Sequence, residues 1–506
     1  MKNILTYMTL VLVISTSAYG QTQPENVTLQ ERIEVLTSDP SLAQALTGIC
    51  VRTADGETLV DINAGKMLVP ASNMKLISTG AALHRLGPDF QYETSIGYSG
   101  DIVEGTLYGD LYIIGGGDPT TGSKDSIAVT LERTFGQWEA IVRSAGIRRI
   151  EGRVIGDGRY FDGMAEEPTW LWNDIGTYYG TGATGLMFYE NMMSFSVSAG
   201  AEVGMPVKIK PYYPETPWMT FRYSCTTGKK GSGDLLYMYT SDLAPVAEIR
   251  GTFGVDRAAK RVDCANKFPE YTCAHYFMNF LKKNGLECTE GAADFRLERI
   301  EGADSICIIG SAFSPSLERI AFETNHDSNN LFAETLLRTL GREECGSACY
   351  DSSYVALDRV LKSLGVDVSR GVKVQDGSGL SRQNHVSPEF FCRFLEAMTD
   401  SPAWPVFVNS LPYPGGNGTL SYNMKGQPET IRKRIRVKSG SMNGVRCYSG
   451  YILPSGTVVQ NGLHDLPEEV RSKTIVFSIM TNNCTSPTWK VRPLLDKIMA
   501  VIASGN

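Results

Sequence analysis

The sequence is poor in the residues and spacings that build metal centres and nucleic-acid interfaces. It has 5 histidines in 506 residues, and its 11 cysteines include no C-x-x-C pair, so the usual ligand spacing of a zinc site is missing. A net charge of -7 does not attract nucleic acid. We therefore expect no metal, no organic cofactor and no nucleic-acid partner.

Two common hydrolase motifs are also missing. The sequence contains neither the G-x-S-x-G elbow of α/β-hydrolases nor the H-E-x-x-H helix of zinc proteases. Residues 117–124 resemble a phosphate-binding loop, but Ser123 stands where that loop needs a lysine. Any hydrolytic activity must therefore use other residues.

Long apolar runs are confined to the first twenty residues. Lys2 gives a positive start, residues 4–14 are apolar, and small side chains follow at the point where a signal peptidase would cut. A buried N-terminal helix is the alternative, but the segment is apolar on all sides, and it is too short to span a bilayer with margin. We expect residues 1–20 to be a signal peptide, cleaved near Gly20, and the mature chain to be exported.

The rest of the chain shows two kinds of sequence pattern. Residues 92–300 read as short strands with Gly-rich turns, whereas both flanking parts carry helical periodicity and longer strands. The flanking parts predict helices at 29–36, 74–86, 317–324, 331–340 and 487–503, and strands at 46–52, 58–62, 435–438, 445–453, 457–460 and 475–480. This order predicts one α/β domain, with N-terminal and C-terminal strands in a single sheet, split by a long insertion.

The first candidate for chemistry is Ser72-Asn73-Met74-Lys75, which follows Pro70 at the start of a predicted helix. A serine hydroxyl needs a base within hydrogen-bond reach before it can act as a nucleophile. Residues three apart share one helix face, so the lysine amine can approach the serine oxygen. Burial can lower a lysine pKa enough for the amine to accept the proton. We predict that Ser72 is the nucleophile and Lys75 its base.

A second motif, Ser328-Asn329-Asn330, falls in the turn between two predicted helices. Its serine can relay a proton to the leaving group, and Asn330 can hold either the lysine of the first motif or the substrate amide. The pattern S-x-N also occurs at Ser421 and Ser441. Only the Ser328 copy lies in a helix-connecting turn away from the other motifs, and we assign the role to that copy.

A third motif, Lys438-Ser439-Gly440, lies in a predicted edge strand. Its cation and hydroxyl can bind a substrate carboxylate, and the missing side chain at Gly440 lets a peptide lie close to the strand. The backbone N–H groups of Ser72 and Ser441 are then the expected oxyanion hole. The motif thus predicts binding of a peptide that ends in a carboxylate.

Together the motifs resemble S-x-x-K, S-D-N and K-T-G of the penicilloyl-serine transferases. Residues 376–382, Asp-Gly-Ser-Gly-Leu-Ser-Arg, look like a segment of the low-molecular-mass class C penicillin-binding proteins, the D-alanyl-D-alanine carboxypeptidase/endopeptidase family. The long insertion, with Gly109-Asp110-Leu111 and the stretch 115–120, is similar to that family's insertion. The resemblance spans about residues 29–503.

The resemblance implies a penicillin-binding or β-lactamase-like α/β (α+β) domain, with an antiparallel sheet flanked by helices. Residues 21–90 and 305–506 would form this catalytic domain, and residues 91–304 a β-rich insertion of two subdomains. The implied activity is that of a serine-type D-Ala-D-Ala carboxypeptidase, a D,D-endopeptidase, or both. Such an enzyme would lie in the periplasm, act on peptidoglycan stem peptides and bind β-lactams covalently; the oligomeric state is left open.

The resemblance also implies roles for individual residues. Ser72 would be acylated and Lys75 would be the base, Ser328 and Asn330 would complete the centre, and Lys438 would bind the terminal carboxylate.

The family further has an aspartate in the insertion that recognises the free end of the diaminopimelate side chain. Asp157 is the candidate for this role, and Arg382 is a further expected substrate contact. The chain departs from the family pattern at Asn329, where Asp is usual, and at Ser439, where Thr is usual. We expect Asn329 to point away from the chemistry, and Ser439 keeps the hydroxyl.

Two other functions share parts of this pattern. A β-lactamase has the same acylation centre, but it must also activate water for fast deacylation, and it needs little more than half of this chain. A non-catalytic wall-binding protein or β-lactam sensor would keep the fold and a reactive Ser72. The intact Lys75, Ser328 and Lys438 argue against the sensor. Rapid turnover of a chromogenic cephalosporin would indicate the lactamase, and release of D-alanine from a pentapeptide would indicate the peptidase.

Overall fold

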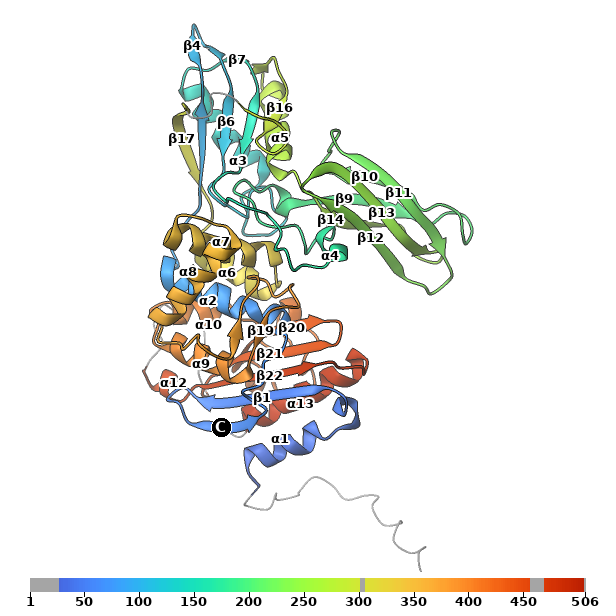
Figure 1. Ribbon diagram of the computed structural model, residues 1–506, viewed down its shortest axis with the longest axis vertical. Coiled ribbons are helices and arrows are strands. Elements are labelled where there is room, and N and C mark those ends of the chain that lie inside the picture. Colours follow the sequence, from blue (N-terminus) through green and yellow to red (C-terminus); the bar gives the residue numbers. More distant parts are fainter. Residues whose placement is uncertain (1–26, 301–304, 456–467, 505–506) are drawn as a thin grey trace, which may run out of the picture.

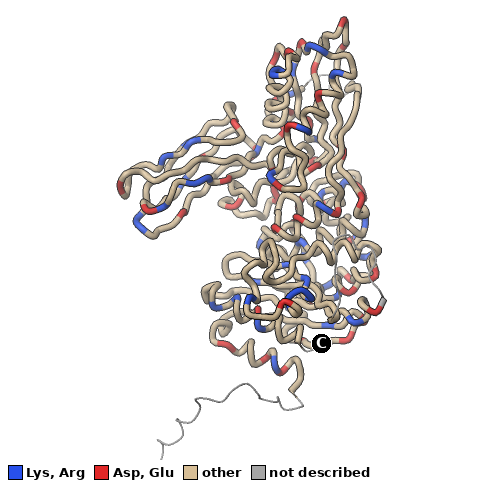
Figure 2. Tube along the Cα trace, turned by 180° about the vertical axis from the view of Figure 1, so that it is seen from behind, with Lys and Arg blue, Asp and Glu red and all other residues tan. Residues whose placement is uncertain are grey.

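The computed structural model describes residues 27–300, 305–455 and 468–504. The predicted signal peptide, residues 1–20, and the predicted strand at 457–460 lie outside the described residues. Figure 1 shows a catalytic part that holds both ends of the described chain, an insertion stacked on it, and an arm that projects sideways from the insertion. Basic and acidic residues alternate along the chain in all three parts (Figure 2).

The catalytic part is built on a five-stranded antiparallel sheet in the order β2-β1-β22-β21-β20. Its strands are β1 (Leu46–Thr53), β2 (Thr58–Ile62), β20 (Ile435–Met442), β21 (Val445–Ile452) and β22 (Ile475–Asn482). N-terminal and C-terminal strands therefore share one sheet, as the sequence predicts. Every residue of β22 is buried, because helices cover both faces of the sheet.

One face of the sheet packs against α1 (Leu29–Thr37) and α13 (Thr488–Ser504). The other face packs against a larger helical layer, in which α2 (Met74–Leu86) is central. The layer also contains α6 (Leu317–His326), α7 (Asn330–Cys345), α8 (Tyr350–Ser363), α9 (Pro388–Thr399) and α10 (Trp404–Asn409). The remaining short elements are β18 (Val372–Lys373), β19 (His385–Val386), α11 (Glu429–Arg432) and α12 (Glu468–Ser472).

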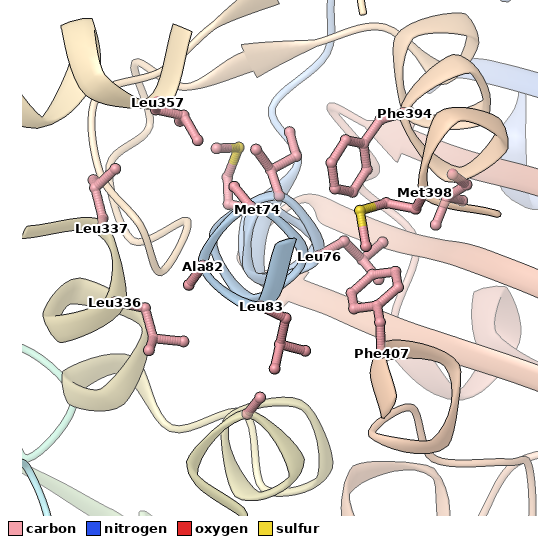
Figure 3. Packing of buried hydrophobic residues seen from close by; sticks show 14 of the residues in the cluster. Met74, Leu76, Ala82, Leu83, Leu336, Leu337, Leu357, Phe394, Met398 and Phe407 are labelled. Carbon is pink, nitrogen blue, oxygen red and sulfur yellow. The ribbon is translucent and has the colours of Figure 1, made fainter. Parts of the chain in front are cut away.

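Helix α2 is buried on all sides rather than along one stripe. Figure 3 shows Leu336, Leu357, Phe394 and Phe407 around it, contributed by α7, α8, α9 and α10. A Cβ on Gly80 would come within 2.7 Å of the Phe394 ring, so the close approach of α9 requires glycine there. This helix, which carries the first motif, is therefore held rigidly in the core.

The insertion contains two sheets and two long helices. The sheets have the orders β16-β8-β6-β3-β17 and β15-β7-β5-β4. Their strands are β3 (Glu93–Tyr98), β4 (Asp101–Val103), β5 (Thr106–Tyr108), β6 (Leu111–Ile114), β7 (Arg149–Glu151), β8 (Val154–Asp157), β15 (Glu287–Cys288), β16 (Ala292–Asp294) and β17 (Cys307–Phe313). The helices α3 (Leu131–Ser144) and α5 (Pro269–Lys283) pack on these sheets. The sequence predicts only strands and turns in this region, so both helices are a difference from the prediction.

The predicted boundary of the insertion at residue 304 is corrected by β17. This strand pairs in antiparallel fashion with β3, so the hydrogen bonds of the insertion's sheet continue to Phe313. The predicted boundary lies just before helical periodicity returns, but β17 is an edge strand whose membership of this sheet depends on pairing with β3 and leaves no periodic signal. The catalytic part resumes at α6.

The arm comprises residues 192–265. Two three-stranded sheets, β10-β9-β14 and β11-β13-β12, share an apolar core. Their strands are β9 (Met192–Ser198), β10 (Lys208–Tyr213), β11 (Thr220–Gly228), β12 (Asp234–Ser241), β13 (Ala244–Gly254) and β14 (Lys260–Ala265). Short helix α4 (Trp172–Ile175) lies against β12, on the side of the arm that faces the catalytic part (Figure 1). Among the described residues, no helix combines the length and apolarity that crossing a membrane requires.

Candidate active site

Ser72 lies in a 3-10 turn, Ala71–Asn73, that leads directly into α2. Ala71 has a φ of 47°, in the left-handed region that non-glycine residues avoid. A Cβ on Gly379, or on Gly440 of β20, would overlap the backbone beside Ser72. These two segments therefore close directly on the nucleophile, and glycine is required at both positions.

Lys75 is completely buried beneath Ser72. Its Nζ lies 3.1 Å from the Oγ of Ser72, and it donates to Oδ1 of Asn330 at 2.6 Å and to the carbonyl oxygen of Ser378 at 2.7 Å. Burial lowers the pKa of Lys75 to about 7, although two nearby carboxylates oppose the shift. Near neutral pH, much of the amine is therefore unprotonated and can accept the serine proton.

The second motif lies between α6 and α7, as the sequence predicts. Ser328 has a φ of 60°, and its Oγ accepts a hydrogen bond from Nζ of Lys438 at 2.9 Å. The Asn330 amide donates to the carbonyl oxygen of Tyr179 at 2.8 Å, which turns its oxygen toward Lys75. Of the two roles open for Asn330, the structure shows the one that holds the lysine.

Lys438 lies in β20, the edge strand of the sheet, and it is completely buried. Its amine donates to the Oγ of Ser328 and to the carbonyl oxygen of Ser439, both at 2.9 Å. Burial and the nearby charge of Lys75 hold the pKa of Lys438 well below its usual value. Exposed Ser441 follows on the same strand. A second buried lysine thus lies against Ser328, where a substrate carboxylate nearby would favour its charged form.

A cleft of about 1040 Å³ joins these groups. Its lining includes Ser72, Ser328, Asn330, Ser441 and Arg382. The cleft therefore joins the first and second motifs and Arg382, which come from segments far apart in the sequence, and Lys438 is linked to it through its hydrogen bond to Ser328. A cleft of this volume is large enough for a peptide rather than a single amino acid.

Asp157 is not part of this cleft. It ends β8, is 3% exposed, and its carboxylate is paired with the guanidinium of Arg159 at 2.8 Å. The backbone N–H of Arg159 also donates to it, at 3.0 Å. A buried carboxylate that is already satisfied in this way cannot reach a substrate amine without losing its partners. This position corrects the assignment of Asp157 as a substrate contact.

Asp174 lines the cleft instead. It lies on α4, and its Oδ1 accepts a hydrogen bond from the hydroxyl of Tyr179 at 3.2 Å. Burial raises the pKa of Asp174, while the Tyr179 hydrogen bond and the charge of Arg382 lower it. The sequence prediction missed Asp174, which lies within an aromatic stretch. That stretch was the one local signal that could have indicated a binding site there, because its side chains lie beside the cleft.

Two buried carboxylates, those of Asp376 and Glu334, bind the turn whose carbonyl group accepts a hydrogen bond from Lys75. Asp376 accepts hydrogen bonds from two backbone N–H groups of its own turn and, at 2.9 Å, from the indole of Trp170 in the insertion. Glu334 of α7 accepts from the backbone N–H groups of Gly377 and Ser378, at 3.1 and 2.8 Å. Burial and the charge of Asp376 raise the pKa of Glu334. Together they position the carbonyl group that holds the base.

Asn329, expected to point away from the chemistry, bridges the second motif and the insertion. Its Oδ1 caps α7 by accepting from the N–H of Phe332 at 3.2 Å, and its Nδ2 donates to Glu190 at 2.8 Å. The other Glu190 oxygen accepts from the hydroxyl of Ser123 at 2.7 Å. All three residues of Tyr189–Asn191 have φ between 52° and 54°, a conformation that costs about 1–2 kcal/mol per residue. The fold thus accepts strain that places the Glu190 carboxylate on the cleft wall.

One group of acidic side chains has the spacing of a cation site. Within the described residues, oxygens of Asp125, Glu323 and Asp327 lie within 4.8 Å of one another. Burial and the charge of Asp125 raise the pKa of Glu323 to about 7. The Glu323 carboxyl is therefore about half protonated near neutral pH, which relieves part of the repulsion in this group without a bound cation.

Comparison with known proteins places this geometry in a family. Residues 29–501 match the D-Ala-D-Ala carboxypeptidase 3 (S13) family. The chain belongs to this family. It is 30% identical over 453 residues to the D-alanyl-D-alanine carboxypeptidase of Actinomadura sp. (strain R39), covering 86% of this chain and 81% of that protein. It is 22% identical over 418 residues to the D-alanyl-D-alanine carboxypeptidase DacB of Haemophilus influenzae, covering 78% and 80%.

The fold agrees with this assignment. It is similar to the crystal structure of penicillin binding protein 4 (dacB) from Haemophilus influenzae, with a TM-score of 0.76 and 20% identity, over 94% of this chain and 98% of that one. The predicted α+β class and the resemblance to the low-molecular-mass penicillin-binding proteins are confirmed. The protein is a serine-type D-Ala-D-Ala carboxypeptidase, a hydrolase.

Proposed function

We propose that this carboxypeptidase cleaves peptidoglycan stem peptides through an acyl-enzyme on Ser72, and that β-lactams acylate the same oxygen. The observation that carries the proposal is the buried Lys75 amine, 3.1 Å from the Oγ of Ser72, in a cleft that also contains Ser328 and Ser441. Residues 1–20 resemble a signal peptide, which supports export to the periplasm, where this substrate lies.

The residues around Ser72 act one after another during acylation. As its Oγ attacks the carbonyl carbon of the penultimate D-alanine, Lys75 accepts the hydroxyl proton. The N–H groups of Ser72 and Ser441 stabilise the negative charge that develops on the carbonyl oxygen. The C–N bond then breaks, and Ser328 relays the proton held by Lys75 to the departing amine. Water attacks the ester on Ser72 and releases the shortened peptide.

The direction of β20 sets the direction of the substrate. A peptide that adds to this edge strand in antiparallel fashion runs from Asn443 toward Lys438. Its C-terminal carboxylate then meets Lys438 and Ser439. The acyl side of the substrate extends past Asn443 toward Arg382, whose guanidinium donates to the carbonyl oxygen of Asn443 at 3.4 Å.

Asp174 is the residue that we propose for recognition of the substrate's diamino acid, in the role first assigned to Asp157. It lies in the cleft with Arg382 and Asn443, on the acyl side of Ser72. Its half-buried carboxylate accepts a hydrogen bond from Tyr179 and can accept others from a substrate ammonium group.

Replacement of Asp174 by Asn is expected to lower kcat/KM roughly tenfold for a pentapeptide with a free side-chain amine, because a charge-assisted hydrogen bond contributes about 1.5 kcal/mol. Steady-state release of D-alanine measures it. The same peptide with its amine acetylated is the control, and its kcat/KM should change little. Equal losses on the two peptides would show that Asp174 does not bind the amine.

Mass spectrometry tests the proposed function. Purified protein is incubated with a pentapeptide and with a cross-linked muropeptide, and loss of D-alanine and cleavage of the cross-link are both expected. After penicillin treatment and trypsin, the adduct should lie on residues 67–75, which contain Ser72, and not on residues 76–85, which contain the neighbouring hydroxyl of Ser78. An adduct outside residues 67–75, or no release of D-alanine, would contradict the proposal.

A further inference from the structure

A second groove opens from the catalytic cleft beneath the arm. It has a volume of about 410 Å³ and lies between residues 176–179 and strands β12 and β14. Tyr178, Tyr179, Tyr237 and Asp263 line both this groove and the cleft of Ser72. The groove therefore continues the substrate cleft on the side of the arm that faces the catalytic part (Figure 1).

Aromatic rings are exposed along this groove. Tyr178 is 59% exposed and Tyr237 is 40% exposed. Tyr239 lies two residues further along β12 and so faces the same side as Tyr237. Its ring is 6.3 Å from that of Trp172, which is 57% exposed. Clustered exposed rings beside a cleft are typical of a binding surface, because a folded protein otherwise gains by burying them.

The polar groups of the groove have balanced charge. Asp234 and Lys260 form an ion pair at 2.6 Å, and Arg261 and Asp263 complete two acidic and two basic residues. These groups offer both donors and acceptors beside the rings but no excess charge of either sign. A stem peptide, which carries several carboxylates, would find no complementary charge here.

A sugar ring fits this combination. A pyranose presents a face of C–H groups that packs on the electron-rich face of an aromatic ring, and a rim of hydroxyl and N-acetyl groups that hydrogen-bonds to polar side chains. The hydroxyl and N-acetyl substituents on the N-acetylhexosamine rings of a glycan strand carry no charge. We infer that this groove binds the sugar rings to which the stem peptide is attached. The inference rests on the proposed action on peptidoglycan and adds a second ligand class to it.

The order of the groups along the cleft agrees with this placement. Asp174, on the acyl side of Ser72, lies on α4, which packs against β12. A substrate that passes Asp174 on its way out of the catalytic cleft therefore meets the rings of Tyr178 and Tyr237 next. Four residues of a stem pentapeptide lie on the acyl side of the scissile bond, and four extended residues span about 14 Å, so the sugar end lies well beyond that bond.

Comparison of two substrates tests the inference. The ratio of kcat/KM for a disaccharide-pentapeptide to kcat/KM for the free pentapeptide should exceed one in the wild type. In the Tyr178→Ala/Tyr237→Ala variant this ratio should fall roughly fivefold to tenfold, from loss of two stacking contacts. Trp489→Ala is the matched control, because Trp489 is 69% exposed on α13 and its loss should leave the ratio unchanged.

A peptide-free probe provides the second measurement. The tetramer of N-acetylglucosamine should bind the wild type in calorimetry and bind the double tyrosine variant less tightly. Addition of the tetramer should leave the rate at which penicillin acylates the wild type unchanged. An unaltered substrate ratio together with no tetramer binding would overturn the inference. Equal losses on both substrates would also overturn it, in favour of a peptide site. Failure to hydrolyse either substrate would instead count against the proposed function, so the two failures are distinguishable.

Discussion

Replacement of Lys75 by Met is expected to slow acylation of Ser72 by about 10³-fold, within the range of 10²–10⁴ for removal of a general base. Met has nearly the length of Lys and no charge, so it can fill the buried site without leaving an unpaired ion. Fluorescent penicillin labelling over time measures the rate. Thermal unfolding of the variant is the control, because a melting temperature close to that of the wild type shows that the fold is kept.

The same residue predicts the pH dependence of the wild type. Burial lowers the pKa of Lys75 to about 7, and only the unprotonated amine can accept the Ser72 proton. The acylation rate should therefore fall tenfold per pH unit well below pH 7 and level off above about pH 8. The residual rate of the Lys75→Met variant should lack this inflection. A flat profile in the wild type, or the same inflection in the variant, would rule out Lys75 as the base.

Replacement of Asn329 by Asp is expected to slow acylation by roughly 30-fold to 100-fold at pH 8, from about 2–3 kcal/mol of lost contact and repulsion. The Asn329 amide donates to Glu190 at 2.8 Å, so a carboxylate in its place would face another carboxylate. The repulsion would displace the turn that holds Ser328 and Asn330. Helix capping is not lost in this variant, because Asp caps an α-helix as well as Asn does.

The reciprocal exchange tests that explanation. Adding Glu190→Gln to Asn329→Asp restores an amide facing a carboxylate, and most of the rate should return. Relative to the wild type, the Asn329→Asp single variant should lose less rate as the pH falls, because a proton on either carboxylate removes the repulsion. If the double variant is as slow as the single one at pH 8, Glu190 does not position the second motif.

Short-range patterns account for most of what could be predicted from the sequence. The apolar periodicity of residues 74–86 predicts α2, and strands such as β2 have the expected bounds. The pairing of Ser72 with Lys75 follows from a helix turn, because three residues of separation always bring two side chains to one face. The assignment of Ser328 over Ser421 also depended only on its place between two helices.

Long-range contacts were beyond the reach of such patterns. Glu190 and Asn329 are 139 residues apart, and nothing near either residue indicates the other. Local sequence singled out Asp157 and gave no reason to consider Asp174, because only the packing of α4 against the arm brings Asp174 to the cleft. The residues of β17 were predicted to belong to the catalytic domain, because their pairing with β3 has no signal in the local sequence.

The sequence by itself determined the chemistry: a serine, a lysine three residues later, and two further motifs whose types suit acyl transfer. The tertiary structure decided which carboxylates surround that chemistry, where the insertion ends, and how the arm extends the cleft. The physical reason is that helix and strand periodicities act over a few residues, whereas burial of Lys75 and the meeting of distant carboxylates, amides and rings depend on packing between segments that the chain brings together only when folded.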